Sequence, residues 1–172
     1  MHNRLFKSVA GKVVALTLGL IMLSVAAVGV STYMRLKDNI IATALRDTQS
    51  AMRGMAILYE MKVGGVALDM GDGELKSVGR ASIGTLRDND LVDRTAAGNG
   101  GIATVFETKA GEYVPVTTNL KNEKGERAAG TKLATDHPAF EKVTKGEAYF
   151  GPATLFGINY MTGYMPVVNK TG

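Results

Sequence analysis

The fold is decided by residues 13–34, which read VVALTLGLIMLSVAAVGVSTYM. This stretch contains no charged side chain and is rich in Leu, Val, Ala, Ile and Met. As an α-helix it would be roughly 33 Å long at about 1.5 Å per residue, and the hydrocarbon core of a bilayer is about 30 Å thick. The stretch therefore predicts a transmembrane helix.

The helical pattern continues beyond the apolar stretch, because neither Pro nor Gly occurs from residue 31 to residue 53. Side chains there recur at spacings of three and four residues, the period of one helix face. The members of this stripe are Ile41, Leu45, Thr48, Met52, Met55 and Tyr59, flanked by Ile40, Ala44, Ala51 and Leu58. We predict a nearly continuous helix over residues 13–63, ending at Gly64-Gly65. Its wide stripe can serve a domain core and a partner helix together.

The charges are distributed unevenly along the chain. Arg4, Lys7 and Lys12 precede the apolar stretch, and no acid occurs before Asp38. Removing these three from the 20 Lys and Arg leaves 17 against 16 Asp and Glu. This near-neutral remainder argues against a nucleic-acid-binding domain. Basic residues beside a first span favour its cytoplasmic end, so we expect the residues after the span to lie outside the inner membrane.

The alternative for the first 30 residues is a cleaved signal peptide, because Ser24-Val25-Ala26 fits a small-x-small cleavage site. The apolar core of a signal peptide is about 7–15 residues, shorter than this run, so an uncleaved anchor is favoured. Both interpretations export the rest of the chain. The expected organisation is a cytoplasmic basic tail over residues 1–12, a transmembrane helix over 13–34 and an extracytoplasmic domain over 35–172.

The first part of the expected domain shows little regular pattern. Glycines interrupt residues 66–85, which we interpret as a solvated connection with a turn at 70–73 and a short helix at 77–86. Residues 98–103 match the nucleotide-binding pattern G-x-G-x-x-A, but that pattern requires a helix after it. Here β-branched residues follow. These glycines therefore indicate a turn that enters a strand.

The second part predicts strands. Residues 102–107 and 113–120 read as a hairpin, with Pro115 marking an edge position or a bulge. A short helix is expected to begin at Asp136-His137-Pro138 and to end at Gly146. Two strand candidates follow, residues 148–156 and 158–168. Residues 169–172 have the composition of a turn. Because no strand follows that turn, we expect the domain to be incomplete.

Catalytic and metal-binding patterns are lacking in the sequence. The two histidines, His2 and His137, have no nucleophile motif beside them, and His137 is more typical of a helix cap than of a base. Asp69 and Asp72 do not have the spacing of a calcium loop. We therefore expect no metal, no cofactor and no enzyme activity, and the absence of Cys excludes disulfides and thiolate chemistry.

The aromatic residues near the end suggest a binding pocket. Tyr160, Thr162 and Tyr164 alternate along one predicted strand and so share a face, with about 13 Å between the two tyrosines. A small molecule with a polar group at either end fits between such hydroxyls. Tyr149 and Phe156 on the neighbouring strand extend the same wall. The alternative is that these rings only fill the core, as most buried aromatic residues do.

Several short motifs occur together after the membrane helix. They are Gly-Gly-Ile-Ala-Thr-Val-Phe at 100–106, Val-Thr-Thr-Asn at 116–119, Gly-Thr-Lys-Leu at 130–133, Gly-x-x-Tyr-x-Gly at 146–151 and Tyr-x-x-x-Tyr-x-Pro at 160–166. Their order resembles a single Cache domain, the PAS-like extracytoplasmic sensor of methyl-accepting chemotaxis proteins. The resemblance covers most of residues 35–172.

The resemblance implies an α+β fold in which the long helix packs on a central antiparallel sheet, with dimers paired along that helix. It also implies a small-molecule pocket on the open side of the sheet. The pocket candidates that it transfers to this chain are Thr118, Asn119, Thr131, Tyr149, Tyr160 and Tyr164. Many relatives carry Arg where this chain has Pro115, which removes a bidentate partner for carboxylates. Arg94, Arg127 or Lys132 would have to replace it.

The predicted function is that of a ligand-sensing, membrane-anchored chemoreceptor domain that binds a small metabolite such as an organic acid. The first alternative keeps the sensor but places it in a histidine kinase or a cyclic-dinucleotide enzyme. The second is an envelope structural protein with a filled core and no pocket. The sequence does not name the ligand or the output module.

Overall fold

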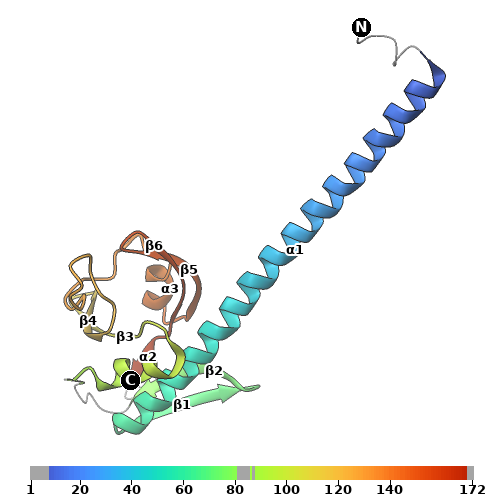
Figure 1. The fold of residues 1–172 in the computed structure, drawn as a ribbon. Coiled ribbons are helices and arrows are strands. Elements are labelled where there is room, and N and C mark those ends of the chain that lie inside the picture. The colour runs from blue at the N-terminus through green and yellow to red at the C-terminus, as the bar shows by residue number, and fades with distance from the viewer. Residues whose placement is uncertain (1–7, 81–85, 87, 170–172) are drawn as a thin grey trace. The chain divides into compact units, whose positions relative to one another are not determined.

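The computed structural model describes residues 8–80, 86 and 88–169. The chain divides into two compact units, residues 1–43 and 44–172, which we describe in turn. Helix α1 (Val9–Lys62) belongs to both units because it runs unbroken through their boundary (Figure 1). The predicted continuous helix is therefore confirmed, as is its end just before the two glycines.

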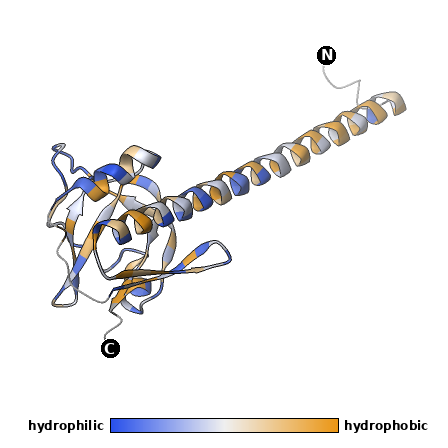
Figure 2. Cartoon of the chain, turned by 90° about the horizontal axis from the view of Figure 1, so that it is seen from below, coloured by the Kyte–Doolittle hydropathy of each residue, from blue (hydrophilic) through white to orange (hydrophobic). Residues whose placement is uncertain are grey.

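In the first unit, α1 is exposed along almost its whole surface from residue 8 to residue 43. Leu16 and Leu23, for example, are 67% and 69% exposed. Hydrophobic residues, coloured orange in Figure 2, recur along this part of the helix. By length and composition, α1 is able to cross a membrane. The first seven residues of the expected basic tail lie outside the described part of the chain.

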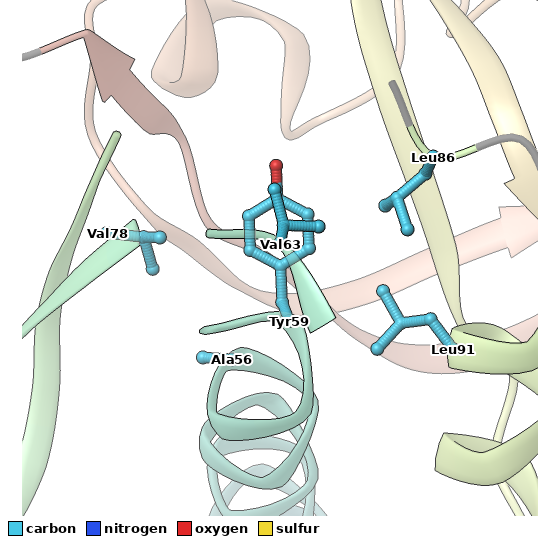
Figure 3. Packing of buried hydrophobic residues seen from close by; sticks show 6 residues of the cluster. All are labelled: Ala56, Tyr59, Val63, Val78, Leu86 and Leu91. Carbon is cyan, nitrogen blue, oxygen red and sulfur yellow. The ribbon is translucent and has the colours of Figure 1, made fainter. Parts of the chain in front are cut away.

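In the second unit, the last turns of α1 form one wall of the core. Ala56, Tyr59 and Val63 are buried there and pack with side chains from two other elements and a connecting segment (Figure 3). These partners are Val78, Leu86 and Leu91. The predicted stripe is half-buried or buried from Leu45 to Tyr59. This part of the stripe therefore packs inside its own domain.

Six of the strands form three antiparallel hairpins. These are β1 (Val66–Gly71) with β2 (Glu74–Arg80), β3 (Thr104–Lys109) with β4 (Glu112–Thr118), and β5 (Tyr149–Leu155) with β6 (Ile158–Tyr164). Each hairpin is closed by two residues that both have positive φ, namely Asp72-Gly73, Ala110-Gly111 and Phe156-Gly157. Turns of this kind match the right-handed twist of the flanking strands.

The expected solvated connection over residues 66–85 is wrong, because this segment contains the hairpin β1–β2. Val66 and Leu68 pack against the core while Ala67 and Asp69 are exposed, which is the alternation of a strand. The helix expected at 77–86 is also wrong, because Ser77 lies in β2, and residues 81–85 lie outside the described chain. Glycines interrupt a helix, but Gly73 here supplies the positive φ that the hairpin turn requires.

The described strands are hydrogen-bonded as three small sheets rather than one, while the α+β class is confirmed. The largest has the order β1-β2-β7, and the short strand β7 (Val167–Asn169) runs parallel to β2. The other two sheets are the hairpins β3–β4 and β5–β6. Pro115 in β4 and Pro152 in β5 have no backbone N–H to donate, as is typical of edge strands. The predicted bulge is confirmed beside Pro115, where the register with β3 shifts.

Two short helices complete the second unit. Helix α2 (Asp90–Asn99) ends at Gly100, whose left-handed backbone lets its N–H bond the carbonyl of Ala96. The chain then enters β3, which confirms the expected turn and strand. Helix α3 (Phe140–Thr144) is shorter than predicted, because the residues around Pro138 form turns before it begins.

Replacing Gly163 with Ala tests how β6 packs on α1. A Cβ at Gly163 would lie 2.8 Å and 2.9 Å from two ring carbons of Phe150 and 3.1 Å from the methyl carbon of Thr48. Because such overpacking costs roughly 1–3 kcal/mol, we expect a lower midpoint of thermal unfolding by circular dichroism. Gly98→Ala is the matched control, since a Cβ there meets nothing within 4 Å. Equal stability of the two variants would contradict this packing.

Candidate functional site

A large cavity occupies the second unit and has a volume of ≈ 1500 Å³. Its walls come from α1, α2, the strands β3, β4 and β6, and the segment 128–137. Typical small-molecule sites are roughly 300–1,000 Å³, so the space suffices for a metabolite with its water. Four of the six predicted site residues line it, namely Thr118, Thr131, Tyr160 and Tyr164.

Strand β6 presents the tyrosines to this cavity. Tyr160, Thr162 and Tyr164 lie at alternate positions, and their partners on β5 are Ala153, Gly151 and Tyr149. The ring of Tyr149 folds over Gly151, where a Cβ would come within 2.6 Å of the tyrosine hydroxyl oxygen. The Tyr149 hydroxyl donates to the carbonyl of Pro152 at 2.9 Å. Tyr149 therefore supports the wall and does not line the cavity.

Tyr164 is surrounded by aromatic rings. Its ring centroid lies 5.0 Å from that of His137, 6.2 Å from that of Phe106 and 6.4 Å from that of Tyr149. Its hydroxyl oxygen lies 3.3 Å from Nε2 of His137. Burial, with a smaller contribution from Tyr149, raises the pKa of Tyr164 to about 12. The Tyr164 hydroxyl therefore keeps its proton at physiological pH.

Tyr160 is the second tyrosine of the cavity wall. It is half-buried, and its hydroxyl has no hydrogen-bond partner within the described residues. A phenol of this kind can donate and accept one bond each. It is therefore available to a molecule that enters the cavity.

The predicted Thr-Asn pair is used mainly to hold the wall together. Thr118 is 2% exposed, and its hydroxyl bonds that of Thr104 at 2.7 Å and accepts the N–H of Leu120 at 3.0 Å. The Asn119 side chain accepts the N–H of Ala103 at 2.7 Å and donates to a carbonyl at 3.1 Å. Asn119 does not line the cavity, and Thr118 has little capacity left for a ligand.

The three cations considered as replacements for a pocket arginine all have acidic partners. Arg127 does not line the cavity, because its guanidinium makes two bonds of 2.9 Å to the carboxylate of Asp93 and one to a backbone carbonyl. Arg94 and Lys132 do line the cavity. Each is exposed and paired on the surface, Arg94 with Asp90 at 2.9 Å and Lys132 with Glu112 at 2.7 Å. None of them is an uncommitted carboxylate partner.

His137 is the cavity residue that the sequence did not assign to the site. The expected cap of a helix is not formed, because α3 has Ala139 as its N-cap and no side-chain cap; the Nδ1 of His137 instead accepts the N–H of Ala139 at 3.1 Å, in the turn before the helix. The same ring also lines the cavity and faces Tyr164 with its Nε2. Burial lowers the pKa of His137, although Asp136 acts in the opposite direction. The only sequence signal was the tripeptide 136–138, which gave no indication of the distant tyrosine.

Metal chemistry finds no support in the described part of the chain, where no group of three or more His, Cys, Asp or Glu side chains converges. The cavity wall consists of hydroxyl, aromatic and apolar side chains with few charges. Such a lining is typical of small-molecule binding sites.

Comparison with protein families gives one match. The model of the family described as Cache 3/Cache 2 fusion domain matches residues 66–172, well over half of the chain. The match begins just after α1 and includes all the strands and the cavity residues of β4 and β6. The resemblance drawn from the sequence motifs is thereby confirmed. Comparisons with curated proteins and with solved structures gave no match.

The lowered pKa of His137 predicts a pH-dependent stability. Unfolding exposes the ring and restores its ordinary value of 6.5, so below that pH the unfolded chain binds more protons than the folded chain. The free energy of unfolding should therefore fall as the pH decreases from about 7 to about 5, a range in which few other side chains titrate.

The measurement is the thermal midpoint of the parent and of His137→Asn across that pH range. Asn does not titrate but can still accept the N–H of Ala139 through an Asx turn. We expect a shallower pH dependence in the variant. Equal slopes in both proteins would mean that His137 is not buried in its neutral form.

Proposed function

We propose a receptor function from the premise that this chain belongs to the Cache 3/Cache 2 fusion domain family, and is therefore an extracytoplasmic sensor domain of a signalling protein. In this proposal the chain binds a small metabolite, such as an organic acid, and is the input half of a methyl-accepting chemotaxis protein. The observation that best supports ligand binding is the cavity, whose wall contains residues of α1 and the hydroxyl side chains of β6.

The apolar half of α1 supports membrane anchoring. Hydroxyl side chains in this half donate hydrogen bonds to backbone carbonyls of the same helix. Thr17 donates to Val14 at 2.9 Å and Ser24 donates to Ile21 at 2.8 Å. A helix in lipid must satisfy its polar groups internally, and these contacts meet that requirement. The three basic residues before the span favour a cytoplasmic amino terminus and a periplasmic sensor in a bacterial inner membrane.

The shared helix provides a route for the signal. Thr48, Met52 and Met55 of α1 line the same cavity as Tyr160 and Tyr164. A ligand that contacts both walls favours the arrangement of helix and strand that fits it best. α1 is continuous from Val9 to Lys62, so the turns that line the cavity and the apolar half belong to one helix, along which a shift can pass.

Two rival functions differ from this proposal in testable ways. A histidine kinase or cyclic-dinucleotide enzyme would use the same sensor, and identification of the output module distinguishes them. An envelope structural protein would need no internal space. The cavity of ≈ 1500 Å³ favours a binding domain over that alternative.

The binding proposal predicts that a metabolite library contains compounds that raise the thermal midpoint of the full chain in detergent micelles. A ligand at about 100 times its dissociation constant stabilises the folded state by about 2.7 kcal/mol. With such a compound, Tyr160→Phe should weaken binding by roughly threefold to tenfold, or up to about 150-fold for a charged ligand, in calorimetric titration. The variant keeps its stability because the hydroxyl has no partner in the described chain.

Tyr149→Phe is the matched control for that experiment. It removes a hydroxyl from the same pair of strands, but one that donates to Pro152 instead of reaching the cavity. We expect a stability loss of about 1 kcal/mol and unchanged binding. If Tyr160→Phe also binds like the parent, the Tyr160 hydroxyl does not contact the ligand.

We further propose a homodimer through the long helix. The inward stripe of α1 is used by the domain core from Leu45 onward, so the partner must meet another face. Ile57 and Met61 are 46% and 78% exposed and lie four residues apart, on one side of α1. Apolar side chains at this spacing suit a helix pair.

The dimer is tested by the double variant Ile57→Asp and Met61→Asp. Two charges in a helix pair should raise the dissociation constant of the dimer at least about tenfold in sedimentation equilibrium of the full chain in density-matched detergent. Glu60→Ala, an exposed change between the two positions, is the control and should leave it unaltered. A monomeric parent, or a double variant as dimeric as the parent, would contradict the proposal.

A further inference from the structure

We infer that His137 sets the hydrogen-bonding polarity of the cavity: it holds the Tyr164 hydroxyl as a donor, so the part of the ligand that reaches Tyr164 must be a hydrogen-bond acceptor. The inference rests on the proposed binding function and deepens it by naming the chemistry of the recognised group. It makes His137 a positioning residue that acts through Tyr164.

The backbone determines which nitrogen of His137 carries the proton. The N–H of Ala139 points at Nδ1 at 3.1 Å, and a backbone amide only donates. Nδ1 must therefore be the unprotonated acceptor, and in the neutral ring the proton lies on Nε2. A second proton on Nδ1 would face the amide proton directly, so this contact opposes the charged form of the ring.

The tautomer determines what Tyr164 can do. The Nε2–H group of His137 donates to the Tyr164 hydroxyl oxygen at 3.3 Å, which occupies one lone pair of that oxygen. The hydroxyl proton then has no acceptor among the described residues. Both side chains line the cavity, so this proton is available to a bound molecule. The ring of Phe106 on the other side offers no competing polar atom.

The other polar groups of the wall agree with an acceptor-bearing ligand. Tyr160, on the same strand face and about 13 Å along the strand, is a second phenol of the cavity wall whose proton has no acceptor among the described residues. The charged side chains that line the cavity are Asp47, Arg94 and Lys132, of which only one is acidic. Carbonyl and carboxylate oxygens are thus the suitable groups, whereas an ammonium group, which only donates, would leave the Tyr164 proton without an acceptor.

The tautomer is measured without a ligand. In the full chain with ¹⁵N-labelled histidine in detergent micelles, a long-range ¹H–¹⁵N spectrum at neutral pH distinguishes a protonated from an unprotonated ring nitrogen. The chain has two histidines, and His137→Gln identifies the signals of the second. We expect a proton on Nε2 and none on Nδ1. A proton on Nδ1 would overturn the inference, whatever the chain binds.

Two substitutions separate the effect of His137 on Tyr164 from its hydrogen bond with the Ala139 amide. His137→Gln brings an amide N–H near the place of Nε2, while His137→Asn keeps an acceptor for the Ala139 amide and loses the reach to Tyr164. With acetate, acetamide or a longer homologue as the probe, Asn should weaken binding roughly threefold to tenfold and Gln should retain it. If the Gln variant binds more weakly than the Asn variant, or if both lose binding equally, His137 does not position Tyr164 and only accepts the Ala139 amide.

The ligand class is tested with matched compounds of similar shape. Short carboxylates and their amides should raise the thermal midpoint, and the corresponding primary amines should not. If the acceptor-bearing compounds give no larger shift than the amines, the inferred class is overturned. Binding by amines alone would leave the proposed sensor function intact, whereas silence across the whole metabolite library would count against that function itself.

Discussion

The core of the second unit is built around the packing of one short segment at the end of α1. Ala56 and Tyr59 are the buried residues of the helix, Val63 follows its end, and the hairpin β1–β2 and helix α2 are arranged around these three side chains. Fully burying a side chain of the size of Val contributes roughly 1.5–3 kcal/mol. Tyr59 also accepts a hydrogen bond from Arg80 at 3.0 Å, which ties the helix to the end of β2.

The hairpins and the cavity depend on side chains that are small or absent at a few positions. Gly163 lets the ring of Phe150 and the methyl of Thr48 approach β6, and Gly151 accommodates the ring of Tyr149 on the opposite face. The β5–β6 hairpin therefore meets Thr48 of α1 at Gly163 on one face and carries Tyr149, Tyr160 and Tyr164 on the other. This division places the hydroxyls of Tyr160 and Tyr164 in a space that the core does not fill.

The cavity wall offers mostly neutral hydrogen-bonding groups rather than a charge clamp. The candidate cations are paired with Asp93, Asp90 and Glu112, and Arg127 in particular is used to join α2 to the end of β4. The absence of an arginine at Pro115 is therefore not compensated by these three side chains. Neutral donors discriminate between ligands by geometry. A ligand that places no acceptor opposite a buried donor leaves that donor without the hydrogen bond it made to water, which weakens binding.

The sequence by itself determined the elements whose signals are local. An uncharged run of residues 13–34 followed by a stripe at helical spacing sufficed for α1, and Pro115 sufficed for the bulge in β4. The hairpin β1–β2 was predictable from Asp72-Gly73, but the glycines around it also suit a loop, and local pattern alone does not choose between them. Alternation along β6 correctly placed Tyr160 and Tyr164 on one face.

Only the tertiary structure decided how these side chains are used. Asn119 and Tyr149 have the residue types of a binding site, yet their polar atoms are satisfied by backbone groups of neighbouring segments. His137 and Tyr164 are far apart in the chain, and their contact arises because a turn before α3 lies against β6. Hydrogen-bond partners between distant segments depend on the folded path of the whole chain. Composition and spacing therefore named the candidates, and packing assigned their roles.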